Sequence, residues 1–170
     1  DELVIEPEIL GQEELTEFFL DTCGNYVTQV YGQLYPFNRK AFAKEEWISE
    51  IVQMWMVSQK DHEYNPIHIH QGTIYTGLSS VMILSLPKDM GPEFAREDVP
   101  MNGTLQIIGA ANGQFVKSDY GPITEERDFY IFPYDMRHVV YPFTNKKAKR
   151  RTLSCNVDVE YNPVNSRTAG

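Results

Sequence analysis

The sequence predicts a mainly β fold, a double-stranded β-helix (jelly roll) with N-terminal supporting helices. Helical patterns come first, short β-rich runs separated by turn signals follow, and 170 residues suffice for one domain with a sizeable core. We therefore expect a single domain over residues 1–170. Residues 1–54 would be mostly helical support and residues 55–160 the β-barrel core.

Two helices are expected in the N-terminal part. Acidic residues crowd the first turn of Gln12–Cys23, its apolar residues share one face, and Gly24 stands where a C-cap belongs. A second helical stretch is predicted over Lys44–Met54, where Trp47 and Ile51 fall on the same side.

From about Trp55 onward the pattern changes to strands. Short runs rich in β-branched and aromatic residues alternate with Pro, Gly-Pro and Asn-Gly turn signals, and Asn112-Gly113 predicts a hairpin between two of them. The predicted strands are Ile67–Gln71, Ile74–Leu86, Thr104–Ala111, Gly113–Val116, Phe129–Phe132, His138–Tyr141 and Arg150–Val159.

The last predicted strand alternates between apolar and polar residues. Its apolar side consists of Leu153, Cys155, Val157 and Val159. Its polar side consists of Arg150, Thr152, Ser154, Asn156 and Asp158. The apolar side should pack on the helices, so the polar side should point into the barrel. A charge buried there must be paired, and we therefore expect a polar or ionic occupant.

Composition and charge exclude several classes of protein. A net charge of −9 argues against a general nucleic-acid binder, and the basic run Lys146–Arg151 is best interpreted as a solvated turn that leads into a strand. No apolar run approaches the length of a transmembrane helix, and the acidic start is not a signal peptide. Cys23 and Cys155 lack metal or redox spacing and are expected to be reduced core residues of a cytoplasmic protein.

Three of the four histidines lie in two short motifs, Asn65–Gly72 and Phe132–His138. In a strand, residues i and i+2 point to the same side, so His68 and His70 offer two imidazoles to one volume. His138, from a distant segment, would complete a facial set of metal ligands with open positions opposite. Non-haem iron uses that geometry to bind a cosubstrate and dioxygen. We predict His68, His70 and His138 as metal ligands.

These motifs resemble those of the Fe(II)/2-oxoglutarate-dependent oxygenases, especially the bacterial and phage branch similar to prolyl 4-hydroxylases. The resemblance covers about the last two-thirds of the chain. Its residues are Asn65-Pro66-x-His68-x-His70-x-Gly72, Gly77–Leu84, Phe132-Pro133-x-x-x-x-His138-x-Val140-x-Pro142-Phe143 and Arg150-x-Thr152-x-Ser154-x-Asn156.

The resemblance implies a role for each motif residue. His68 would be the first iron ligand and His138 the distal one, while an arginine about a dozen residues later would bind the far carboxylate of 2-oxoglutarate. We choose Arg150 over Arg151 because Arg150 lies on the polar face, where Thr152 could add a hydroxyl. Most of the family carry Asp or Glu where this chain has His70.

The expected function is that of an Fe(II)- and 2-oxoglutarate-dependent dioxygenase. The resemblance implies a hydroxylase of a peptide or protein (prolyl hydroxylation included) or of a small molecule, with dioxygen as the other cosubstrate, in the cytoplasm or in the host cytoplasm if the chain is phage-encoded. Two alternatives stay open. One is a cupin-type metalloenzyme that does not use 2-oxoglutarate, although Ile74 stands where the acidic cupin ligand belongs. The other is a non-catalytic jelly-roll binding module.

Overall fold

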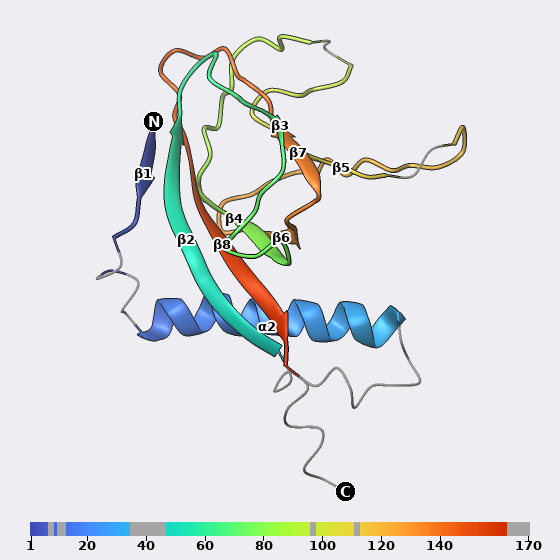
Figure 1. Cartoon of the computed structure of the whole chain (residues 1–170). Helices are drawn as coiled ribbons and strands as arrows, with labels where there is room; N and C mark the ends of the chain where they lie inside the picture. Colours follow the sequence, from blue (N-terminus) through green and yellow to red (C-terminus); the bar gives the residue numbers. More distant parts are fainter. Residues whose placement is uncertain (7–8, 10–12, 35–46, 96–97, 111–112, 163–170) are drawn as a thin grey trace, which may run out of the picture.

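The computed structural model describes residues 1–6, 9, 13–34, 47–95, 98–110 and 113–162 (Figure 1). Within them, one long helix and eight strands are formed. In chain order they are β1 (Glu2–Val4), α2 (Glu13–Leu34), β2 (Trp47–Gln59), β3 (Asn65–His68), β4 (Gly77–Ser85), β5 (Leu105–Ile108), β6 (Phe129–Pro133), β7 (Arg137–Val140) and β8 (Arg150–Tyr161).

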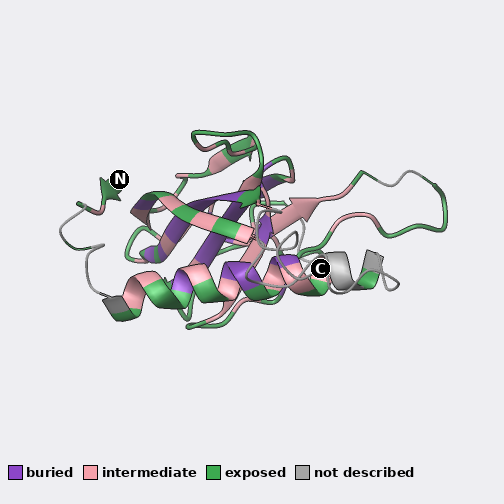
Figure 2. Cartoon of the chain, turned by 60° about the horizontal axis from the view of Figure 1, so that its bottom comes forward, coloured by how far each residue is buried: buried purple, intermediate pink, exposed green. Residues whose placement is uncertain are grey.

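Two antiparallel sheets form the jelly roll. The larger sheet has the order β1-β2-β8-β4-β6, and the smaller has the order β3-β7-β5. In both views α2 runs along the larger sheet, and its buried positions face the strands (Figures 1 and 2). The predicted fold class is therefore confirmed: mainly β, with helical support from the N-terminal part.

The larger hydrophobic cluster of the core lies between α2 and the larger sheet, and a smaller one contains Val81, Ile83 and Phe132. Phe19, Cys23 and Val27 follow one another at helical spacing and are almost completely buried against Val157 and Cys155 of β8. Both cysteines are free and buried, as expected from the sequence. Apolar burial on this scale is the dominant stabilising term in a domain of this size.

The predicted end of the first helix at Gly24 is wrong, because α2 continues to Leu34. Gly24 is buried and lies beside Trp47 and Ser49 of β2. A glycine inside a helix costs about 1 kcal/mol relative to alanine. The apolar face continues beyond it with the buried Val27, and packing of that face offsets the cost.

The predicted helix over Lys44–Met54 is also wrong. Residues 44–46 lie outside the described part of the chain, and Trp47 begins the long strand β2. This strand pairs with β8 from Trp47↔Tyr161 to Gln59↔Arg150, with one irregularity between Ile51 and Gln53. The apolar residues fit a strand as well as a helix, and pairing along almost the whole length of β8 decides between them.

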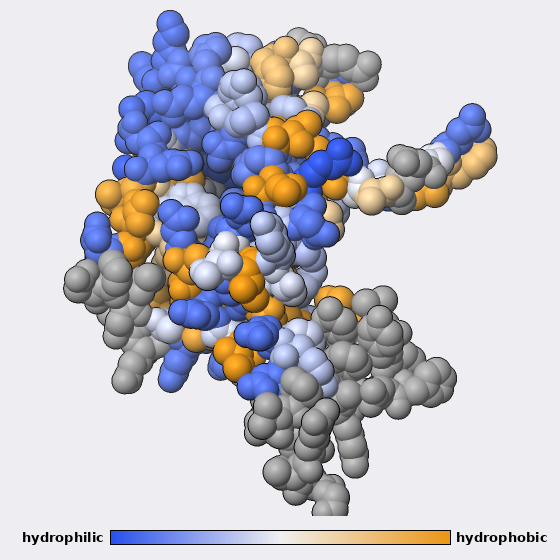
Figure 3. All heavy atoms as spheres, in the orientation of Figure 1, coloured by the Kyte–Doolittle hydropathy of each residue, from blue (hydrophilic) through white to orange (hydrophobic). Residues whose placement is uncertain are grey.

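Six of the seven predicted strands correspond to β3–β8, with ends that differ by a few residues. Gly113–Val116 is not a strand: beyond Ile108, the chain returns to the smaller sheet with a single bridge, Ile107↔Tyr120. Asn112 of the predicted hairpin lies outside the described residues. The chain from Gly113 towards Tyr120 projects from the barrel (Figures 1 and 3). Phe115, in this part of the chain, is 98% exposed.

The predicted alternation of β8 is confirmed. Cys155, Val157 and Val159 face the core beneath α2. The polar residues Arg150, Thr152, Ser154 and Asn156 line a pocket on the opposite side of the sheet. Arg150 is 2% exposed and Arg151 is exposed, so the arginine on the polar face is the one that points inward.

No helix in the described part of the chain combines the length and the apolar character needed to cross a membrane.

We expect Phe19→Ala to lower the free energy of unfolding by about 3–5 kcal/mol, because it leaves a cavity between α2 and the larger sheet. Phe18→Ala is the matched control: Phe18 is the adjacent residue but is 43% exposed, so its loss should be clearly smaller. Urea unfolding followed by circular dichroism measures both. Equal losses in the two variants would contradict this description of the core.

Candidate functional site

Three histidines meet between the two strands β3 and β7. Pairing of these strands places His68 directly opposite His138, and His70 follows two residues after His68. One ring nitrogen from each histidine lies within 4.8 Å of the others. The nearest pair is Nε2 of His70 and Nε2 of His138, which are 3.1 Å apart. The structure thus brings together all three histidines that the sequence singled out.

Backbone carbonyls fix the orientation of two of these rings. Nδ1 of His68 lies 2.6 Å from the carbonyl oxygen of Pro66, and Nδ1 of His138 lies 3.1 Å from that of Met136. A carbonyl can only accept, so Nδ1 carries the proton in both rings and Nε2 keeps its lone pair. Metal-binding histidines commonly have their second ring nitrogen held in this way.

Burial keeps two of the rings neutral. It lowers the pKa of His70 from 6.5 to about 4, and the neighbouring His138 and His68 add to the effect. Burial likewise lowers the pKa of His138 to about 4, against an opposing hydrogen bond to Met136. Neutral imidazole is the form that binds a metal. Two lone pairs 3.1 Å apart repel each other, so the Nε2 atoms of His70 and His138 require a proton or a cation between them.

The histidines open into a pocket of about 360 Å³. The polar face of β8 forms one wall, and apolar side chains such as Val81 and Leu105 line it as well. Trp55 of β2 also lines the pocket, and its ring centroid lies 5.7 Å from that of His70. The site therefore combines three potential metal ligands with a pocket large enough for a small cosubstrate.

Arg150 is the charged residue buried in this pocket. Its Nε and Nη2 atoms have no hydrogen-bond partner among the described residues. Arg150 also forms no ion pair with any described residue. Burial lowers the pKa of Arg150 to about 10, so its guanidinium is still charged at neutral pH. A buried cation without an anion is costly, and Arg150 lines a pocket that an anion could occupy.

Sequence reasoning missed one wall of the pocket. Gln53, Trp55, Val57 and Gln59 line it from alternate positions of β2. Their spacing of two residues is the signal that would have identified them, but a helix was predicted over part of the segment. Tyr134 is buried, whereas Tyr64 and Tyr75 are exposed.

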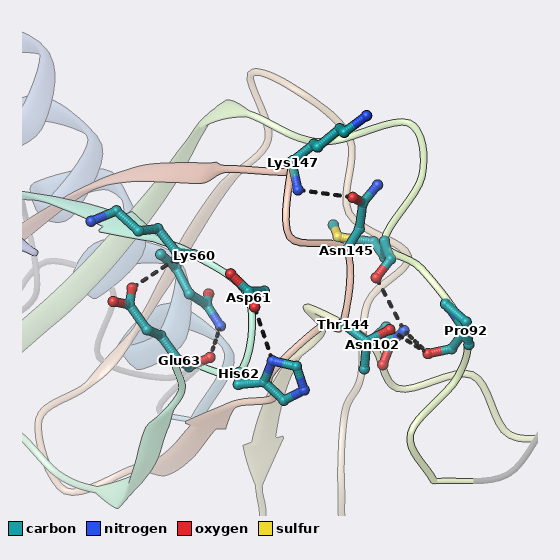
Figure 4. A network of polar contacts seen from close by, with 11 residues as sticks. Lys60, Asp61, His62, Glu63, Pro92, Asn102, Thr144, Asn145 and Lys147 are labelled. Carbon is teal, nitrogen blue, oxygen red and sulfur yellow. Dashed lines mark hydrogen bonds and ion pairs between the residues drawn. The ribbon is translucent and has the colours of Figure 1, made fainter.

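The fourth histidine, His62, is an exposed residue of the β2–β3 turn. Its Nδ1 lies 3.1 Å from Oδ2 of Asp61. Figure 4 shows this turn beside the loops that contain Asn102 and Asn145, where side-chain amides and backbone groups bond to one another. These contacts organise loops of the barrel and do not add to the histidine cluster.

Residues 53–156, more than half of the chain, match the model of a family described as putative 2OG-Fe(II) oxygenases. The chain therefore belongs to the 2-oxoglutarate- and Fe(II)-dependent oxygenase family, whose members use Fe(II) and 2-oxoglutarate. No curated protein sequence matches it.

Solved structures support the same fold. The chain is similar to an α-ketoglutarate-dependent epimerase, SnoN from nogalamycin biosynthesis (TM-score 0.52, 11% identity, covering 96% of this chain and 65% of that one). It is also similar to a prolyl-4-hydroxylase from Pseudomonas putida (TM-score 0.50, 13% identity, covering 91% and 66%). The chain spans 49% to 66% of the length of the first three structures it matches.

The lowered pKa values of His70 and His138 predict how the stability of the metal-free protein depends on pH. Between pH 6.5 and about 4 the unfolded chain takes up protons that the folded protein does not. Stability should therefore fall as the pH drops through this window, and this contribution should level off below pH 4.

His70→Gln should make the loss of stability over this pH window smaller, whereas His62→Gln, at an exposed position, should leave it unchanged. Urea midpoints at several pH values measure the effect. The same pH dependence in His70→Gln and in the wild type would be inconsistent with a depressed pKa for His70.

Proposed function

We propose that this chain is an Fe(II)- and 2-oxoglutarate-dependent dioxygenase that hydroxylates a peptide or protein (a prolyl residue among the candidates) or a small molecule. One observation supports the proposal above all others. Three histidines converge at a pocket whose wall carries a buried arginine with unused donors. A redox metal and a dicarboxylate that reaches from the metal to the arginine would satisfy both features.

His68, His70 and His138 would hold the iron. The donor set fits, because imidazole nitrogens bind Fe(II) well and Nε2 is free to bind in the two rings that backbone carbonyls orient. Compared with the two histidines and one carboxylate common in the family, this set carries one negative charge fewer. The proposal is therefore a three-histidine iron centre.

Arg150 and Thr152 would bind the far carboxylate of 2-oxoglutarate. The guanidinium offers Nε and Nη2, two donors along the same edge of the planar group, and a carboxylate accepts such a pair bidentately. Thr152 is buried two residues along the same face of β8 and lines the same pocket. Arg151 is exposed and cannot serve this role without a change of register.

When bound, iron and 2-oxoglutarate supply the oxidising chemistry, in which dioxygen is consumed and 2-oxoglutarate is converted to succinate and carbon dioxide. The protein supplies ligands, orientation and shelter from water. Trp55, whose ring lies beside that of His70, and the apolar side chains of the pocket would limit the access of water to the bound groups. The amides of Gln53 and Asn65 line the same pocket and could orient a substrate.

Arg150 also separates this proposal from its alternatives. A cupin-type metalloenzyme without 2-oxoglutarate, or a non-catalytic binding module, would leave the buried guanidinium without an anion.

Succinate formation from 2-oxoglutarate that requires added Fe(II) is the decisive test of the proposed function. A screen of peptides, free amino acids and other small molecules for stimulation of this reaction would identify the substrate class. Stoichiometric Fe(II) binding without any turnover of 2-oxoglutarate would refute the proposal.

His68→Ala or His138→Ala should abolish stoichiometric Fe(II) binding while the far-ultraviolet circular dichroism stays that of the wild type. His70→Ala should be nearly as damaging. His70→Asp should bind iron at least as well as the wild type, since it restores the commoner ligand set. Metal titration followed by tryptophan fluorescence, to which Trp55 beside His70 contributes, measures affinity, with His62→Ala as the control. Wild-type affinity in His138→Ala would rule out this ligand assignment.

Arg150→Ala should raise the 2-oxoglutarate concentration needed for half-saturation by orders of magnitude, because losing one partner of a buried charge pair costs about 3–5 kcal/mol. Fe(II) binding should be spared. Arg150→Lys should recover only part of the loss, since an ammonium cannot form the bidentate pair. Arg151→Ala is the matched control and should behave as the wild type. Titration of the iron-loaded protein, read from the visible metal-to-ligand band, gives the result. A shift in Arg151→Ala alone would move the role to Arg151.

A further inference from the structure

His70 differs from the other two histidines in how it is held. His68 and His138 each have Nδ1 placed by a backbone carbonyl. His70 is placed through its backbone: its N–H donates to the carbonyl oxygen of Tyr134, at 2.9 Å. The position of the His70 ring therefore depends on whatever fixes Tyr134 and the loop that follows His70.

Asp158 of β8 fixes both. Its Oδ2 accepts hydrogen bonds from the backbone N–H groups of Thr73 and Ile74, at 2.9 and 3.1 Å. Its Oδ1 accepts from the hydroxyl of Tyr134, at 3.0 Å. Asp158 is 7% exposed and forms no ion pair with a described residue. Three donors thus converge on one buried carboxylate.

The residues around Asp158 and Tyr134 are closely packed. A Cβ added at Gly72 would collide with Oδ1 of Asp158, and one added at Gly77 would collide with the ring of Tyr134. The N–H of Tyr134 also donates to the carbonyl of Gly77, at 3.0 Å. Burial and the bond to Asp158 raise the pKa of Tyr134, so its hydroxyl stays a donor.

We infer that Asp158 is a positioning residue for the metal centre: acting through Tyr134 and through the backbone of Thr73 and Ile74, it holds His70 where its imidazole can be the third ligand. The inference rests on the three-histidine centre of the proposed function. Backbone carbonyls orient the rings of His68 and His138. In the same way, the carboxylate of Asp158, near the C-terminal end of β8, would orient His70. Partners that orient a metal ligand typically contribute 10–100-fold to metal affinity.

Asp158→Asn is the direct test. Whichever way the amide is turned, one side of it presents N–H groups, so it cannot accept from all three donors. Asp128→Asn is the matched control. Asp128 resembles Asp158 in its bonding, because it accepts hydrogen bonds from the backbone N–H of Glu125 and from the hydroxyl of Tyr130. Neither of these partners belongs to the loop that contains His70.

Zinc bound to protein labelled with ¹⁵N-histidine provides a readout that is independent of activity. The chain has four histidines, so each ring can be assigned, with His62 as internal reference. The wild type and Asp128→Asn should show three zinc-bound Nε2 atoms. Asp158→Asn should show two, with His70 free, and a zinc dissociation constant about 10–100-fold higher. Three bound rings in Asp158→Asn, with affinity within about twofold of Asp128→Asn, would overturn the inference, as would a wild type in which His70 is unbound.

Tyr134→Phe provides a second test of the inference, which can be used if Asp158→Asn fails to fold. It removes one hydroxyl and leaves the backbone carbonyl, so the same change is expected with a smaller loss of affinity. Tyr130→Phe is its control, and equal behaviour of the two would also overturn the inference. A wild type that binds zinc through three histidines but never converts 2-oxoglutarate would refute the proposed function and leave the role of Asp158 intact.

Discussion

The register of β8 is the constraint on which the rest of the structure depends. Its pairing with β2 on one side and β4 on the other fixes which side chains point to each face of the larger sheet. One face completes the core with α2, and the other places Arg150 in the pocket. A shift of one residue would turn Arg151 and the apolar side chains of β8 into the pocket, and the polar side chains towards α2. Stability and the candidate site are therefore specified by the same backbone hydrogen bonds.

Where the pattern of the sequence is local and two-sided, it was sufficient to predict the structure. The alternation in β8 predicted both the face that packs on α2 and the arginine that is buried. The spacing of His68 and His70 predicted two rings on one side, and the second motif supplied His138. The pairing of β3 with β7 brings these motifs together, as expected, although nothing in a single sequence gives the distances between the rings.

Elements whose structure depends on distant partners could not be predicted in this way. Trp47 and Ile51 suit a helix or a strand, and only the long pairing with β8 selects the strand. Gly24 has the local character of a helix end, but burial of Val27 carries the helix past it. Asp158 looks like one more polar residue of an alternating strand, because its three donors come from segments that are 24 to 85 residues away.

The proposed donor set of three imidazoles has a consequence for the choice of metal. Nitrogen donors of this kind suit copper, nickel and zinc as well as iron, and the affinity of such a site rises from Fe²⁺ through Co²⁺ and Ni²⁺ to Cu²⁺. A carboxylate ligand would add charge without changing that order. Occupancy by iron in a cell would thus be governed by which metals are available when the protein folds. A sample purified on immobilised nickel would need to be stripped and reloaded before its metal content could be interpreted.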